Sequence, residues 1–124
     1  KRLVTNYQRA GNMYPKEFNN ALDQFLDITQ SLSNAWKSEN VDLIIDLLRA
    51  YDVQIKKLDK IGGIGVYTQV HTNIQSIASR HNVFYKPSGA GGGDIGLAVS
   101  SSLDALNNFS DEIGKVAWDI GCFD

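Results

Sequence analysis

A glycine-rich segment between two apolar stretches holds the residues whose types and spacing suit chemistry. Residues 86–94 read Lys-Pro-Ser-Gly-Ala-Gly-Gly-Gly-Asp, with four glycines in nine positions. Glycines admit positive φ angles and let main-chain N–H groups approach an anion closely, so that they form a concave nest. The Ser88 hydroxyl and the Lys86 ammonium would suit a phosphate in the same place. The alternative is a flexible hairpin loop without a ligand, because glycine is common in turns.

The segment does not match the common nucleotide-binding fingerprints. The Walker A motif requires Gly-Lys-Ser/Thr after four variable positions, whereas here Asp94 and Ile95 follow Gly93. The dinucleotide-binding fingerprint requires a helix after the glycines, whereas residues 95–99 read as a strand. The segment holds no arginine and no lysine other than Lys86. We therefore expect it to form one wall of a phosphate site, not a whole site.

Helical periodicity dominates the chain before this segment. Apolar residues recur at steps of three, four or seven, which places them on one face of each helix. Asn40 is a good N-cap for the second helix. Residues 4–12 show no clear period. The predicted helices cover residues 16–36, 41–59 and 66–80.

Short strands are predicted on both sides of the glycines, at residues 83–85 and 95–99. A helix over 103–117 follows, with a break expected near Ser110 and an end at Gly121. Residues 122–124 would begin a further strand. This order predicts an α+β sandwich, a single domain with helices on one face of a small sheet.

The segment Lys86 to Ala98, Lys-Pro-Ser-Gly-Ala-Gly-Gly-Gly-Asp-Ile-Gly-Leu-Ala, closely resembles the third conserved motif of the GHMP kinases. The Gly-Gly-Gly-Asp form with Lys-Pro-Ser ahead of it is most like the phosphomevalonate kinases. Mevalonate kinases and galactokinases typically carry a fourth glycine where this chain has Asp94. The surroundings agree with the family, because Ile64-Gly65-Val66 opens the preceding helix and Trp118 to Gly121 resembles the closing helix and turn.

The resemblance implies that the chain is the carboxy-terminal half of a two-domain kinase. That half is a ferredoxin-like α+β sandwich, with helices packed on a small, mostly antiparallel sheet. The amino-terminal kinase domain carries the main phosphate loop and the catalytic side chains. It is expected to be absent here, because no Pro-x-x-x-Gly-x-Gly-Ser-Ser stretch occurs in these residues.

The resemblance also implies an activity for the complete enzyme. It would transfer the γ-phosphate of ATP to phosphomevalonate in isoprenoid biosynthesis, with the nucleotide and Mg²⁺ bound mainly by the amino-terminal half. Two alternatives stay open. One is another GHMP kinase, acting on mevalonate or a sugar, and the other is a non-catalytic module that binds a phosphorylated metabolite.

The residues that would bind the phosphate or substrate are those of the glycine-rich segment. Lys86 is a candidate phosphate neighbour, although we favour a solvated lysine at the end of a strand. Asp94 is a candidate for substrate or metal contact, although aspartate in a turn more commonly bonds local N–H groups. No catalytic residue and no metal ligand is assigned. The predicted contacts are the main-chain N–H groups, together with one hydroxyl, of Ser88, Gly89, Ala90, Gly91, Gly92 and Gly93.

Other reactive side chains are assigned structural roles. His71 and His81 have no carboxylate or cysteine at metal-ligand spacing, and His81 is expected at a helix end, where the dipole favours it. Trp36 and Trp118 fall on apolar helix stripes and are expected in the core. Cys122 lies in an apolar run and is expected to be a buried small side chain.

Composition excludes several classes of function. The 124 residues are 43% hydrophobic and 21% charged, which is typical of a globular protein. A net charge of -2 argues against nucleic-acid binding. Lys56, Lys57 and Lys60 are balanced by Asp52 and Asp59, so we expect a solvated helix face there.

The sequence also bears on compartment. No apolar run approaches the roughly 20 residues that span a bilayer, so no membrane partner is expected. One cysteine fits a reducing compartment. These features predict a cytoplasmic location, and they do not indicate an oligomeric state.

Overall fold

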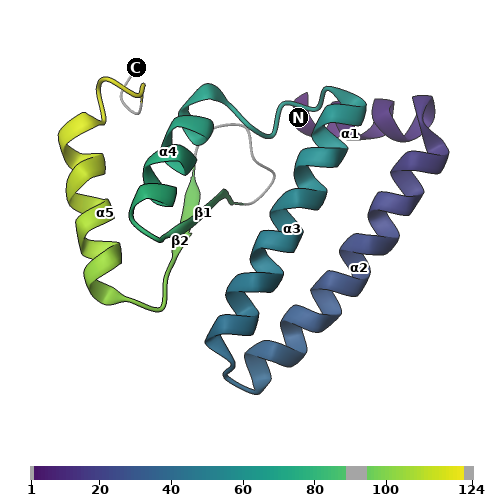
Figure 1. The fold of residues 1–124 in the computed structure, drawn as a ribbon. Helices are drawn as coiled ribbons and strands as arrows, with labels where there is room; N and C mark the ends of the chain where they lie inside the picture. The colour runs from purple at the N-terminus through teal and green to yellow at the C-terminus, as the bar shows by residue number, and fades with distance from the viewer. Residues whose placement is uncertain (1, 89–94, 122–124) are drawn as a thin grey trace. The chain divides into compact units, whose positions relative to one another are not determined.

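The computed structural model describes residues 2–88 and 95–121, which contain five α-helices and a two-stranded sheet (Figure 1). The chain divides into two compact units, residues 1–66 and 67–124. The coarse α+β class is confirmed, with far more helix than strand. The finer ferredoxin-like assignment and the single domain stay predictions. The elements are α1 (Arg2–Met13), α2 (Pro15–Lys37), α3 (Val41–Gly62), α4 (Gln69–Arg80), β1 (Phe84–Pro87), β2 (Gly96–Val99) and α5 (Leu103–Val116).

The first unit is built on the helical hairpin of α2 and α3, which lie side by side in Figure 1. Pro15 opens α2 at a position where its missing N–H costs no hydrogen bond. Asn40 caps α3 as predicted, because its side chain accepts a hydrogen bond from the Leu43 N–H at 3.2 Å. Between the helices, the Phe25 and Tyr51 rings meet edge to face, with their centroids 5.1 Å apart. The hairpin is thus specified by a cap and by aromatic packing.

The end of α3 is held by a carboxylate. The Asp59 Oδ1 accepts hydrogen bonds from the Gly65 N–H at 2.6 Å and the Val66 N–H at 3.3 Å. The Asn6 side chain donates to the Ile64 carbonyl at 2.8 Å, which joins α1 to the same turn. This turn therefore depends on α1, a helix that was not predicted from the sequence.

One expectation about the surface holds in part in this unit, and one about the core is wrong. Lys56, Lys57 and Lys60 are exposed and Lys56 pairs with Asp52 at 3.1 Å, as expected, although the Asp52 side chain is itself only 8% exposed. Asp59 likewise serves the turn just described. Trp36 is 67% exposed although it falls on the apolar stripe of α2. The buried face of α2 runs through Ala21, Phe25, Leu32 and Ala35, and Trp36 lies one position beside it.

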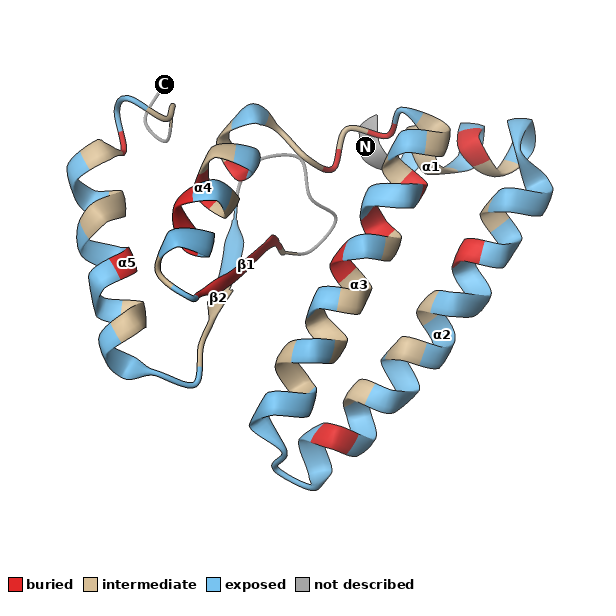
Figure 2. Cartoon of the chain, in the orientation of Figure 1, coloured by how far each residue is buried: buried red, intermediate tan, exposed pale blue. Residues whose placement is uncertain are grey.

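The second unit packs α4, α5 and the strands around one apolar cluster, and Figure 2 shows β1 buried along its length. The strands pair antiparallel, with Tyr85 opposite Ala98 and Pro87 opposite Gly96. Side-chain oxygens of Thr68 and Ser102 cap the two helices. The buried members of the cluster are Ile74, Ile77, Ala78, Val83, Tyr85 and Phe109.

The C-terminal part of this unit departs from the prediction. α5 runs through Ser110 without a break, because that residue lies on the exposed face of the helix. The helix ends at Val116, and Gly121 closes the following turn with a φ of 85°. Trp118 is 76% exposed and does not join the core. The predicted strand at 122–124 and the expected burial of Cys122 lie outside the described residues.

An ion-pair cluster joins α4 to α5. His81 ends α4, as predicted, and its Nε2 lies 2.7 Å from the Glu112 Oε1. Arg80 pairs with the other carboxylate oxygen of Glu112. The hydrogen bond from His81 lowers the pKa of Glu112, and Arg80 lowers it further, against an opposing effect of partial burial. The cluster therefore favours the ionised carboxylate.

Replacing Gly62 by alanine should destabilise the first unit. A Cβ at this position would lie 2.5 Å from the Ala10 Cβ, so α1 and α3 would have to move apart. We expect a loss of about 1–3 kcal/mol in the free energy of unfolding, measured by chemical denaturation. Gly114→Ala is the matched control, since a Cβ added there would have nothing within 4 Å and alanine favours the helix. Equal stability of both variants would contradict this packing.

Glu112→Gln should lower the midpoint of thermal unfolding in a pH-dependent way. Because the pKa of Glu112 in the folded chain lies below its unfolded value of about 4.3, the ionised Glu112 stabilises the fold at every pH above about 4.3. This stabilisation is lost as the pH falls through the lowered pKa of the folded chain. The difference from wild type should therefore be full near neutral pH and shrink in acid. The exposed Glu39→Gln is the control. A difference that stays constant with pH would refute the pairing.

Candidate functional site

The glycine-rich segment is mounted on the paired strands of the second unit. Pro87 has no N–H to donate, and the Ser88 N–H instead bonds to the Ile95 carbonyl at 3.0 Å, just beyond the last strand pair. Residues 88 and 95 are therefore held together at the base of the loop. The predicted contacts of the glycine-rich segment lie outside the described residues and stay predictions. They involve Gly89, Ala90, Gly91, Gly92, Gly93 and Asp94.

Ser88 is the predicted contact that the structure does describe. Because its N–H is engaged by the Ile95 carbonyl, its hydroxyl is the better candidate to meet an anion. The residue is half-buried at the point where the chain leaves β1. Its main-chain role is to close the loop.

Lys86 is not the solvated lysine that we expected. The residue is only 8% exposed, and its Nζ donates to the Pro87 carbonyl at 2.6 Å. A buried ammonium needs hydrogen-bond partners to offset its desolvation, and this carbonyl supplies one. Contact between Lys86 and a phosphate stays a prediction, and in this conformation the Nζ bonds to the carbonyl of the next residue.

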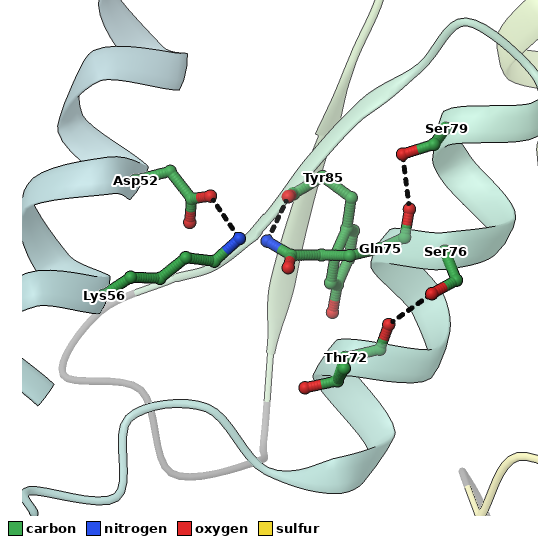
Figure 3. A network of polar contacts seen from close by, with 7 residues as sticks. All are labelled: Asp52, Lys56, Thr72, Gln75, Ser76, Ser79 and Tyr85. Atoms are coloured by element: carbon green, nitrogen blue, oxygen red, sulfur yellow. Dashed lines mark hydrogen bonds and ion pairs between the residues drawn. The ribbon is translucent and has the colours of Figure 1, made fainter. Parts of the chain in front are cut away.

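Helix α4 holds Tyr85 at two points, just before the loop begins. The Gln75 side chain donates to the Tyr85 carbonyl at 3.0 Å, a contact drawn in Figure 3. One turn earlier in α4, the His71 Nδ1 and the Tyr85 hydroxyl share a hydrogen bond of 2.8 Å. His71 is 2% exposed. This pairing was not predicted from the sequence, although the four-residue spacing of His71 and Gln75 already placed them on one face of the helix.

The end of the loop also meets Tyr85. A Cβ built on Gly96 would lie 1.8 Å from the Tyr85 hydroxyl oxygen and 2.1 Å from the Cζ. The φ of Gly96 is not positive, so glycine is needed here for space and not for backbone conformation. The aromatic ring thus lies against the bare backbone of β2, on the diagonal from its strand partner Ala98.

The described residues of the second unit line open hollows, of which two adjoin the strands and α5. One, of about 410 Å³, lies beside Tyr85 and Gly96 and is walled by Phe109 and Ile113. The other, of about 640 Å³, lies beside Arg80 and the start of α5. Neither contains a cluster of metal ligands, since no group of three His, Cys, Asp or Glu side chains that could hold a metal ion occurs in residues 2–88 and 95–121.

In the same ranges, no helix has the length and apolar character to cross a bilayer.

Comparison with known proteins identifies a fold. No family model matches the chain, and no curated protein is similar to it. A solved structure is similar: the crystal structure of a Lin0012 protein from Listeria innocua, with a TM-score of 0.86 over 93% of this chain. The chain shares that protein's fold. At 20% identity the likeness shows the fold alone, and the chain spans 32% of the Listeria protein's length.

The base of the loop should be visible in amide hydrogen exchange. The Ser88 N–H should exchange at least about tenfold more slowly than in an unstructured peptide, because the bond to Ile95 must open first. NMR of the 124-residue chain would measure this rate. Exchange of Ser88 at the unstructured rate would mean that the loop is not closed at its base.

Proposed function

We propose that this chain is the carboxy-terminal domain of a GHMP-type kinase. The complete enzyme transfers the γ-phosphate of ATP to a small phosphorylated alcohol, and the acceptor that best suits the motif is phosphomevalonate. The observation that carries the proposal is the segment Lys86 to Ala98. Its sequence resembles a kinase motif. Its two ends belong to the paired strands β1 and β2, and the Ser88 N–H bonds to the Ile95 carbonyl just beyond the last strand pair.

Main-chain amides are suitable groups for this reaction. In phosphoryl transfer the protein mainly positions the reactants and stabilises charge that spreads over the phosphoryl oxygens. N–H groups that are already oriented do this without reorganising during the step. In the proposal, the amides of residues 89–93 and the Ser88 hydroxyl contact the phosphoryl oxygens, and the closed base of the loop limits how far those groups can move.

In the proposal, the side chains that remove the acceptor proton and hold the metal ion belong to the amino-terminal kinase domain, as the resemblance to the GHMP kinases implies. The length of the structural neighbour supports a larger protein, because this chain matches about a third of it. Lys86 is given no catalytic part, since its Nζ donates to the Pro87 carbonyl.

The natural polypeptide that carries these residues should convert ATP and phosphomevalonate, with Mg²⁺, to ADP and diphosphomevalonate. ³¹P NMR of the reaction mixture would identify the product. Gly92→Val should lower kcat by about 100-fold, because a side chain in the nest displaces the phosphoryl group from its donors. Gly114→Ala is the control on α5 and should retain wild-type turnover. Residues 1–124 alone should show none.

The other outcomes separate the alternatives. Turnover with mevalonate or a sugar, and not with phosphomevalonate, would keep the kinase and overturn the acceptor. Binding of phosphomevalonate in calorimetry without turnover of any acceptor would indicate a non-catalytic phosphometabolite-binding module. Robust turnover by residues 1–124 alone would refute the assignment of the catalytic groups to another domain.

A further inference from the structure

We propose that His71 and Tyr85 are positioning residues for the glycine-rich loop, an inference that rests on the proposed function. The hydrogen bond between them fixes the Tyr85 ring from α4, and the ring in turn fixes the strand on which the loop ends. Neither side chain is assigned a contact with substrate. Their effect on the reaction passes through residues 88 and 95, which form the base of the loop.

Helix α4 holds Tyr85 at both ends of the residue. The Gln75 side chain binds its carbonyl and His71 binds its hydroxyl. A tyrosine ring rotates about two side-chain bonds, and a hydrogen bond at its tip removes most of that freedom. His71 is itself 2% exposed and cannot move without disturbing the core. The ring is therefore fixed relative to α4.

The Tyr85 ring also contacts β2. Since a Cβ at Gly96 would meet the Tyr85 Oη at 1.8 Å, the ring occupies the place of the missing side chain. Gly96 follows Ile95 directly, and the Ile95 carbonyl accepts the bond that closes the loop. A shift of the Tyr85 ring would move Gly96 and therefore the adjacent Ile95, whose carbonyl closes the loop. On the first strand, Tyr85 lies three residues before Ser88, the residue that directly follows β1.

The Tyr85 hydroxyl distinguishes positioning from simple core packing. The ring packs in the apolar cluster with Phe109, and packing alone would require only a ring. The hydroxyl adds nothing to that cluster, yet it is paired with a buried histidine. A buried polar pair costs desolvation and is favourable only when its geometry is satisfied, which makes it a device for specifying one arrangement. Tyr85→Phe isolates this contribution because it keeps the ring.

The decisive measurement compares Tyr85→Phe with wild type in the natural polypeptide. We expect kcat to fall about 10–100-fold while KM for ATP stays within about threefold, because a small displacement near the reacting groups has this effect on rate. The midpoint of thermal unfolding should also fall, because the buried His71 loses this hydrogen bond, and Tyr85→Phe should remain folded at the assay temperature. Tyr14→Phe, which removes an exposed hydroxyl from the first unit, is the matched control and should match wild type.

Two further sets of variants test the path. His71→Asn places an amide near the position of the Nδ1 and should retain more activity than His71→Leu, which offers no hydrogen bond. Gly96→Ala should be impaired, and Tyr85→Leu should make that alanine less harmful than it is beside tyrosine, because the clash is removed. Independent, additive effects of the last two changes would contradict the contact.

NMR of the 124-residue chain distinguishes failure of this inference from failure of the kinase assignment. Tyr85→Phe should shift the amide resonances of Ser88 and Ile95 and leave those of α2 unchanged. If the natural polypeptide has no kinase activity but these shifts appear, the kinase assignment fails and the positioning stands. If wild type is active and Tyr85→Phe changes neither the rate nor these resonances, the positioning inference is overturned.

Discussion

The space above Gly96 is the constraint that links helix α4, the strand pair and the glycine-rich loop. Tyr85 fills that space only because residue 96 has no side chain, and it stays there because His71 and Gln75 hold it from α4. Short two-stranded sheets are marginal by themselves and need a helix to pack against. Here Tyr85 packs the strand pair against α4 and also fixes how β2 lies relative to that helix. Tyr85 and Gly96, which flank the loop, are therefore tied to a helix that precedes both strands in the sequence.

Long, strongly periodic segments were predictable, since the stripes of α2, α3 and α5 depend only on neighbours three and four residues away. The helix α1 was missed although Leu3, Tyr7, Ala10 and Tyr14 recur at steps of three and four, and it is held in place by contacts such as that of Asn6 with Ile64. The caps of Asn40 and His81 are local and were recognised. Lys86 and Asp52 were misjudged because burial is set by parts of the chain that spacing does not reveal.

Part of the candidate site could be predicted from the sequence and part could not. A run of glycines, a serine and a lysine is visible in the printed sequence, and so is its likeness to a kinase motif. The residues that hold the ends of this glycine-rich segment could not be predicted. His71 and Tyr85 are 14 residues apart, in different elements, and only the fold brings an imidazole against a phenol. Gly96 looked like one more glycine of the motif, whereas the structure gives it a separate reason, the ring that lies against it.

Trp36 and Trp118 bear on how this protein can be studied. They are the only two tryptophans, one lies in each compact unit, and both indoles are largely in contact with solvent in the folded chain. Indole emission moves to longer wavelength when water surrounds the ring, so the native spectrum should already resemble that of the unfolded chain. Intrinsic fluorescence is consequently a weak reporter of denaturation for this molecule. Circular dichroism, which follows the five helices directly, is the better probe of the described residues.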